Sequence, residues 1–310
     1  MDYLFLILGF ALLLGSGHFL ISSASSIALK FNLSKMVVGL LFVSLGTSAP
    51  ELFVSLSAAL TGHGDISVGN VVGSNIANIA LALGLTALIV PIVVKSPTIL
   101  RDWLWMAFSV ILLISLAYIL DYRLNYIVGL VFLSLLAFYI YISIRDGKMN
   151  EEEIEEGFKH QPLLLTISIF IASLVGMYYG SEFLISSATS ISLKWGVSEK
   201  VISVTIVAFG TSIPEITTSL MAAIKKEASI SIGTIIGSNI FNILSILGIT
   251  SLVHPIIINP KMVHFDMMWM LAVSIFMLLS ILPLRRGKLG RINGLLLVIV
   301  YLTYIFLQFR

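Results

Sequence analysis

Apolar residues occupy most of the chain in long runs that short polar segments interrupt. A helix of about 20 apolar residues is long enough to cross a bilayer. The pattern predicts ten transmembrane helices, over 3–29, 36–61, 66–92, 99–120, 125–144, 162–193, 200–224, 229–256, 265–283 and 290–308. The first and sixth are the longest, so we expect both to be tilted in the membrane.

Composition supports a membrane location for the whole chain. Hydrophobic residues make up 58% of the 310 residues and charged residues 11%, with a mean hydropathy of +1.06. Such a chain has too little polar surface for a soluble protein, so we predict an all-α polytopic membrane protein. The N-terminal segment has no basic region or small-residue cleavage site, so we interpret 3–29 as the first span. No cysteine is present, which excludes disulfides and thiolate sites.

The two halves of the chain repeat each other at a constant offset of 164 residues. His18–Phe31 aligns with Glu182–Trp195 with 10 identities in 14 positions, and Gly69–Asn78 aligns with Gly233–Asn242 without a gap. Each copy holds five predicted helices, an odd number, so the second copy enters the membrane from the opposite side. We therefore predict two inverted repeats, 1–144 and 162–310, joined by a polar linker at 145–161.

The basic residues are distributed unevenly between the two sides of this topology. Ten helices place thirteen Lys and Arg residues on one side and five on the other. The side with more basic residues faces the cytosol in most membrane proteins. We expect a protein of the cell membrane with both termini outside and the 145–161 linker in the cytosol.

The strongest chemical signal is a pair of motifs inside two apolar runs. Val43–Glu51 reads V-S-L-G-T-S-A-P-E, and Val207–Glu215 reads V-A-F-G-T-S-I-P-E. A carboxylate in hydrocarbon is costly, and an adjacent proline removes a backbone donor and kinks the helix. Two such exceptions built from the same residues mark a shared site and point to ion transport. The site motifs extend over 43–78 and 207–242.

Oxygen atoms dominate the predicted site. Thr47 and Glu51 are four residues apart and share a helix face, as do Thr211 and Glu215. The same spacing recurs in Ser74 with Asn78 and in Ser238 with Asn242. The glycines and prolines of the motifs allow the helices to open, which predicts that backbone carbonyls such as those of Ser44 and Ala208 point at a ligand.

Such an oxygen cage suits hard cations. Six to eight oxygen ligands with two carboxylates match Ca²⁺, and smaller subsets match Na⁺. The motifs contain no His or Cys, which argues against Zn²⁺ or Cu²⁺.

With these motifs, G-T-S-A-P-E with G-S-N-I-A-N and G-T-S-I-P-E with G-S-N-I-F-N, the sequence resembles the sodium/calcium exchanger family over nearly its whole length. The resemblance implies a secondary antiporter, not an enzyme, that exchanges one Ca²⁺ for several Na⁺ by alternating access through four overlapping sites. It implies no cofactor, and we expect a monomer in the lipid bilayer with no nucleic-acid partner. The residues that it implies as ligands are Glu51, Glu215, Thr47, Thr211, Ser48, Ser212, Ser74, Ser238, the carbonyls of Ser44 and Ala208, and, at the middle, Asn78 and Asn242.

One position departs from the pattern of the family. Many members carry Asp where this chain has Asn242, so the site here has a formal charge of −2 instead of −3. This charge still matches Ca²⁺. The resemblance then implies that K⁺ co-transport is absent and that proton sensitivity is reduced.

Other functions remain open at this point. A Ca²⁺/H⁺ antiporter, or an exchanger of Mg²⁺ or Mn²⁺, would use the same carboxylates. A cation channel could also pair two glutamates, but broken helices in two repeats favour alternating access. An intramembrane hydrolase would need a nucleophile with a base at membrane depth, and the predicted helices place no His beside a Ser there.

Overall fold

The computed structural model describes residues 2–93, 98–147, 162–195, 210–281 and 288–308, which are almost entirely helical. Within these ranges eight helices are long and apolar enough to cross a membrane. They are α1 (Asp2–Phe31), α5–η2–α6 (Gly64–Ile76, Ala77–Leu83 and Gly84–Ile89), α7 (Ile99–Ile119), α8 (Tyr126–Asp146), α9 (Leu163–Lys194), α13–η5–α14 (Ala228–Phe241, Asn242–Leu247 and Gly248–Val253), η6–α15 (Met262–Met267 and Met268–Ile281) and α16 (Arg291–Gln308), where η marks a π-helical segment.

Two further apolar segments are broken or shorter. The first comprises α2 (Lys35–Val37), η1 (Val38–Val43), α3 (Ser44–Thr47) and α4 (Ala49–Leu60), and it bends by 46° between α3 and α4. It passes as a ninth span if the bent pair is counted as one. The second is α12 (Ile213–Ile224). The first part of the predicted helix 200–224 and most of the predicted linker 145–161 lie outside the described residues.

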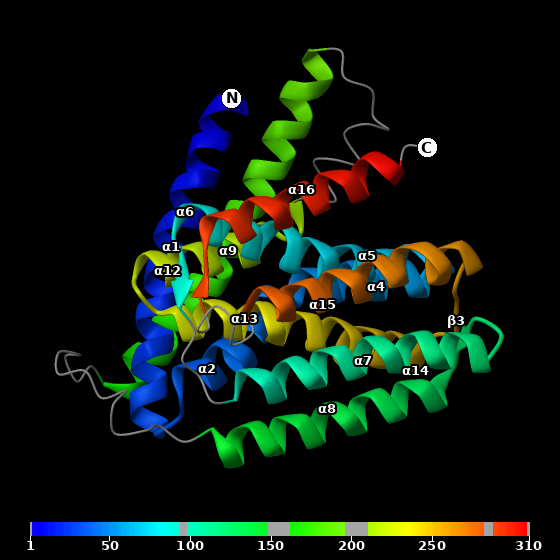
Figure 1. Cartoon of the computed structure of the whole chain (residues 1–310). Helices are drawn as coiled ribbons and strands as arrows, with labels where there is room; N and C mark the ends of the chain where they lie inside the picture. Colours follow the sequence, from blue (N-terminus) through cyan, green and yellow to red (C-terminus); the bar gives the residue numbers. More distant parts are fainter. Residues whose placement is uncertain (1, 94–97, 148–161, 196–209, 282–287, 309–310) are drawn as a thin grey trace.

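The two longest helices, α1 and α9, lie side by side and are steeply inclined to the other long helices (Figure 1). Small residues permit this close packing. A Cβ atom at Gly9 would lie 2.9 Å from the carbonyl oxygen of Gly180, and one at Gly176 would lie 2.2 Å from the Ser16 hydroxyl. The predicted pair of long, tilted helices is therefore present, with Gly180 at its contact.

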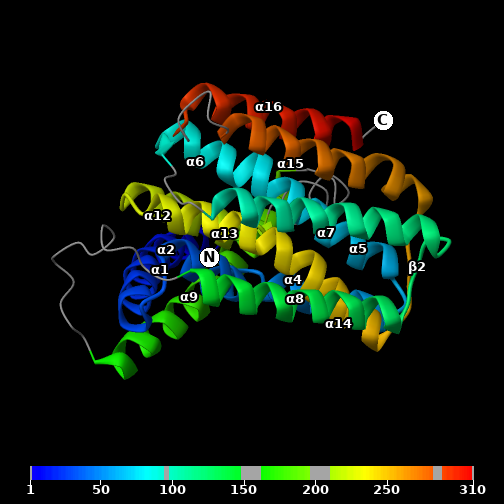
Figure 2. The same cartoon turned by 60° about the horizontal axis from the view of Figure 1, so that its bottom comes forward.

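The remaining helices pack in layers around α13 (Figure 2). In the apolar window of α13–η5–α14, 89% of the residues are buried, against 28% in α1 and α9. Glycines allow η1 to approach α13 at backbone distance, since a Cβ at Gly39 would lie 2.6 Å from the Ile230 carbonyl oxygen. Helices of the two halves thus interleave at the centre of the molecule.

Short antiparallel ladders join the halves in the same way at two places. β1 (Ile92–Val93) pairs with β4 (Lys288–Leu289), and β2 (Arg123–Leu124) pairs with β3 (Ile256–Ile257). The starts of β1 and β3 are 164 residues apart, and those of β2 and β4 are 165 apart. The loop that follows the third helix of each half therefore pairs with the loop between the fourth and fifth helices of the other half.

Contacts between loops group the helix ends as the charge pattern predicts. The Ser34 amide donates to the Gly147 carbonyl at 2.7 Å, and Lys35 pairs with Glu227 at 3.0 Å. These segments were all assigned to the side rich in basic residues. The β2–β3 ladder holds segments that were assigned to the opposite side. Which end faces the cytosol stays a prediction.

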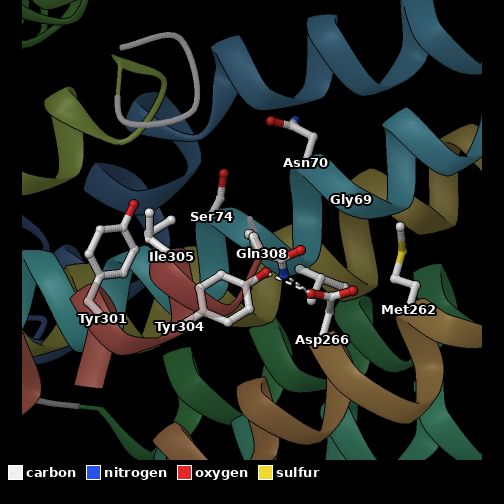
Figure 3. Close-up of a pocket in the computed structure, with 11 residues that line it drawn as sticks. Gly69, Asn70, Ser74, Met262, Asp266, Tyr301, Tyr304, Ile305 and Gln308 are labelled. Atoms are coloured by element: carbon white, nitrogen blue, oxygen red, sulfur yellow. Dashed lines mark hydrogen bonds between the residues drawn. The ribbon is translucent and has the colours of Figure 1, made fainter. Parts of the chain in front are cut away.

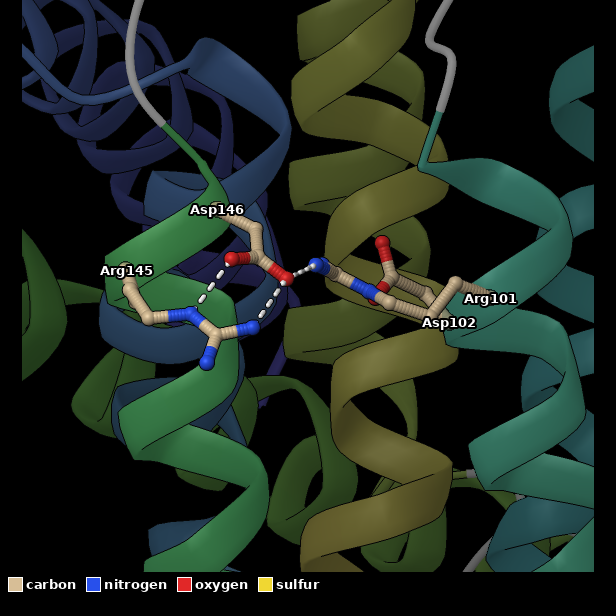
Figure 4. A network of polar contacts seen from close by, with 4 residues as sticks. All are labelled: Arg101, Asp102, Arg145 and Asp146. Atoms are coloured by element: carbon tan, nitrogen blue, oxygen red, sulfur yellow. Dashed lines mark hydrogen bonds and ion pairs between the residues drawn. The ribbon is translucent and has the colours of Figure 1, made fainter.

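A buried carboxylate on α7 is neutralised by the preceding arginine (Figure 4). Asp102 is fully buried, and its Oδ1 accepts from the Arg101 guanidinium, whose Nη2 lies 2.8 Å away. The Arg101 guanidinium also reaches Asp146 of α8 at 3.3 Å, and Asp146 pairs with the exposed Arg145 at 2.7 Å. This network joins α7 to α8 at one membrane end.

We expect Arg101→Gln to destabilise the protein strongly. The substitution leaves Asp102 buried without a counter-charge, which costs about 3–5 kcal/mol. Arg145→Gln is the control, because its 60% exposed ion pair contributes about 1 kcal/mol or less. Thermal unfolding of purified protein in detergent measures both effects. Equal midpoints for the two variants would show that the buried pair contributes no more than the exposed one.

Candidate ion-binding site

Both motif glutamates lie in the first turn of a helix that follows a break. Ser48 and Ser212 precede α4 and α12 with nearly identical backbone angles, φ −84° and ψ 5° against φ −87° and ψ 2°. A proline follows in the first turn of each helix, where its missing N–H costs no helical hydrogen bond. Glu51 and Glu215 come next and are fully buried. Each carboxylate therefore has the positive end of a helix dipole beside it.

The prolines affect a different carbonyl from the one expected. A proline removes the donor for the carbonyl four residues earlier, which is Gly46 for Pro50 and Gly210 for Pro214. The Gly210 carbonyl accepts from the Ser181 hydroxyl of α9 at 3.0 Å. The Ser44 carbonyl keeps two donors, the Ser48 amide at 2.9 Å and the Thr47 hydroxyl at 3.3 Å. It can reach an ion only where these donors share or release it.

Seven buried side-chain oxygens of the predicted site have no hydrogen-bond partner among the described residues. They are both carboxylate oxygens of Glu51, Oε2 of Glu215, Oγ of Ser212 and Ser238, and Oδ1 of Asn78 and Asn242. More than nine in ten buried polar groups in proteins are hydrogen-bonded, so a concentration of exceptions needs an explanation. All seven are oxygens that can coordinate a cation.

Residues of both halves surround the Glu215 carboxylate. The Ser48 hydroxyl donates to its Oε1 at 3.2 Å, and the side chains of Thr47 and Ser238 also lie against it. Glu51 lies near enough to interact electrostatically with Glu215. The two motifs, separated by 164 residues in sequence, therefore form one site.

The central amides are held in place by a second pair of asparagines. Asn242 donates to Oδ1 of Asn75 at 3.0 Å, and Asn78 lies 3.5 Å from Oδ1 of Asn239. Each of these interactions leaves the Oδ1 atom of Asn78 or Asn242 free to bind a ligand. The amides of Asn75 and Asn239 in turn lie 3.5 Å from the sulfur atoms of two equivalent methionines, Met270 and Met106. π-Helical segments, which are common at functional sites, begin at Ala77 and Asn242.

The structure brings together most of the predicted ligands. Ser44, Thr47, Ser48, Ser74, Ser212, Ser238, Asn78 and Asn242 are buried with the two glutamates, and Thr211 is half-buried. Ala208 lies outside the described residues. Ser74 additionally lines a cavity that is discussed below.

Electrostatically, the site is an uncompensated pair of negative charges. No Lys or Arg of the described ranges forms an ion pair with Glu51 or Glu215. Nor do those ranges hold a group of three or more His, Cys, Asp and Glu side chains that could bind a metal. The arrangement of two carboxylates with hydroxyl and amide oxygens suits a cation of the Ca²⁺ or Na⁺ type better than a transition metal.

Comparison with known proteins decides the family. The sequence matches the model of the sodium/calcium exchanger protein family over residues 1–145 and 165–310. The chain belongs to this family. It is 36% identical to the putative antiporter CaxA of Alkalimonas amylolytica, over 99% of this chain and 98% of that protein. It is 29% identical to the sodium/calcium exchanger MaX1 of Methanosarcina acetivorans, again over 99% and 98%.

The fold agrees with a solved exchanger. A structure of the sodium-calcium exchanger NCX_Mj superimposes with a TM-score of 0.84 at 30% identity, covering 98% of this chain and 97% of that one. The protein is therefore a multi-pass membrane antiporter of the sodium/calcium exchanger family, which is a family of transporters and not of catalytic enzymes.

Sequence reasoning missed the exchanger residues that support the ligands. Asn70 donates to the Glu51 carbonyl at 3.2 Å and to the Ser55 hydroxyl at 2.9 Å. In the other half, Ser219 and Ser231 share a hydrogen bond of 2.7 Å at positions equivalent to Ser55 and Ser67. The spacing contained a usable signal, because Ser55 follows Glu51 by four residues and Asn70 precedes Ser74 by four.

Proposed function

We propose that this protein is a secondary active antiporter that exchanges Ca²⁺ for Na⁺ by alternating access. The observation that carries the proposal is the cluster of seven unpartnered buried oxygens around two carboxylates that no described cationic side chain neutralises. A site with charge −2 is balanced by one Ca²⁺. Two Na⁺ ions would balance the same charge, and a further Na⁺ can use the neutral oxygens.

The exchange would take place between two inverted five-helix repeats, 1–144 and 162–310, within a ten-helix topology. The equivalent breaks before α4 and α12 and the reciprocal strand ladders support this repeat structure. Ligand sites at the interface of such repeats are a general feature of secondary transporters. We further propose a monomer in the cell membrane, with both termini outside and residues 145–161 in the cytosol.

The proposed ligands are the side chains brought together at the centre. Glu51 and Glu215 are shared by most of the ion positions, and the neutral oxygens complete the individual coordination shells. These oxygens come from Thr47, Thr211, Ser48, Ser212, Ser74, Ser238, Asn78, Asn242 and the carbonyls of Ser44 and Ala208. The Gly46 carbonyl, which lacks its helical amide donor, is an additional candidate.

Reconstitution tests the coupling ion directly. In proteoliposomes with an outward Na⁺ gradient we expect uptake of ⁴⁵Ca²⁺ that stops when the Na⁺ gradient collapses. An outward H⁺ gradient of the same size should drive little uptake. The opposite result would assign a Ca²⁺/H⁺ antiporter, and competition by Mg²⁺ or Mn²⁺ would reveal another divalent substrate. Single-channel currents under voltage would instead identify a cation channel.

Asn242→Asp tests whether the central amides lie in the ion path. A third carboxylate beside Glu51 and Glu215 is repelled by both, so it has to bind a proton or a further monovalent cation. We expect Ca²⁺ transport to persist and to acquire a pH or K⁺ dependence that the native protein lacks. Asn78→Asp, the equivalent substitution, should behave similarly.

The measurement for these two variants is Na⁺-driven Ca²⁺ uptake across a pH series, with and without K⁺. If native and variant profiles coincide, position 242 lies outside the ion path.

A further inference from the structure

A second polar cavity lies beside the ion-binding site, between α5, η6 and α16 (Figure 3). Its volume is about 390 Å³, enough for a cation that retains several water molecules. Ser74, a proposed ion ligand, lines this cavity together with Asn70, which is hydrogen-bonded to the Glu51 backbone. The other lining residues are Gly69, Val72, Gly73, Met262, Asp266, Tyr301, Tyr304, Ile305 and Gln308.

Asp266 is the acidic residue of this lining. Its Oδ1 accepts hydrogen bonds from the Tyr304 hydroxyl at 2.9 Å and from the Gln308 side chain. Within the described ranges no donor reaches Oδ2, and no Lys or Arg forms an ion pair with this carboxylate. The side chain is half-buried. Its charge is therefore oriented by neutral donors and remains available to a cation in the cavity.

Comparison with the first half shows that this charge is specific to the second. Asp266 and Asp102 occupy equivalent positions, and each lies beside an equivalent tyrosine, Tyr304 or Tyr139. In the first half Arg101 neutralises the aspartate. The position equivalent to Arg101 is Phe265, whose ring stacks on Tyr304 with centroids 6.3 Å apart. The second half thus retains the carboxylate without the adjacent arginine.

We propose that Asp266 forms a cation-recruiting site at one entrance to the exchanger, which holds a hydrated Ca²⁺ or Na⁺ before it passes Asn70 and reaches Ser74. This inference rests on the proposed function. The cavity lies at the end of the molecule that the topology assigns to the outside, because it includes the start of α5, the start of η6 and the end of α16. One carboxylate with hydroxyl and amide oxygens gives weak binding, which suits a site that must release its ion.

Asp266→Asn tests this role. The amide preserves the shape and the hydrogen-bond acceptor but removes one charge. A unit charge about 4 Å from a monovalent ion in water changes its occupancy by about fivefold, and the doubled charge of Ca²⁺ raises this to about 25-fold. We expect the apparent KM to rise by about these factors for Na⁺ and Ca²⁺ at the outer face only. The maximal rate and the KM at the inner face should not change.

Two matched variants separate charge from structure. Asp266→Glu restores the charge and should return KM to within about twofold of the native value. Asp65→Asn removes an exposed charge near the start of α5, outside the cavity, and should leave KM unchanged. High ionic strength should reduce the effect of Asp266→Asn. If Asp266→Asn matches Asp65→Asn, or raises KM equally at both faces, the recruiting site is excluded.

Equilibrium binding separates failure of this inference from failure of the proposed function. In protein that carries both Glu51→Gln and Glu215→Gln, we expect weak ⁴⁵Ca²⁺ binding that Asp266→Asn removes and Asp65→Asn preserves. Absence of Na⁺-driven uptake in the native protein, with this binding intact, would reject the exchange mechanism and keep the site. Binding that is insensitive to Asp266→Asn would reject the site, whatever the transport result.

Discussion

Glu51→Gln and Glu215→Gln are each expected to abolish Ca²⁺ transport while the protein remains folded. Each substitution leaves a divalent ion with one carboxylate in a buried site. At an effective dielectric constant of about 20, loss of one charge at about 4 Å weakens binding by about a thousandfold or more. The measurement is ⁴⁵Ca²⁺ flux with purified variants in proteoliposomes. Glu182→Gln, an exposed position on α9 outside the site, should retain native flux.

Thermal unfolding shows whether the loss is specific to the ion. Ca²⁺ should stabilise the native protein, because a ligand that binds only the folded state shifts the unfolding equilibrium. Neither glutamine variant should gain this stabilisation, and without Ca²⁺ neither should be less stable than the native protein, since two buried like charges repel each other. Native flux in either variant would disprove the assignment of that glutamate.

A disulfide between α1 and α12 is expected to stop exchange. We predict that α1 and α9 move together against the other helices and thereby open the site to each side in turn. A Cβ atom at Gly17 would lie 3.7 Å from Cβ of Met221, close to the mean of about 3.8 Å in disulfides. The native chain has no cysteine, so the double variant Gly17→Cys, Met221→Cys forms one defined bridge.

The control is a disulfide within the moving pair. A Cβ atom at Gly176 of α9 would lie 3.3 Å from Cβ of Ser16 of α1, so the double variant Ser16→Cys, Gly176→Cys links these helices to each other. This bridge should leave exchange intact. Ca²⁺ flux before and after reduction with dithiothreitol measures both variants. Full activity of the oxidised α1–α12 variant would show that the pair does not slide.

The sequence was sufficient for the helices and for the chemistry of the centre. A bilayer requires about 20 apolar residues per helix, so hydropathy alone located the segments that the structure describes as long helices. The repeat offset and the costly Pro–Glu pairs marked Glu51 and Glu215, because carboxylates persist at membrane depth only where something binds them. The ten-helix count and the ligand assignments still await experiments.

Only the tertiary structure decided which oxygens are free. Hydrogen bonds between helices distant in sequence engage the Ser44 and Gly210 carbonyls and orient Asn78 and Asn242, and no local pattern encodes them. The same reason applies to the glycines: Gly9 and Gly180 make the close helix contact, whereas Gly15 contacts nothing within 4 Å. Asp102 and Asp266 are alike in the repeat, yet one is neutralised and the other faces a cavity, because charge compensation depends on neighbours that only folding supplies.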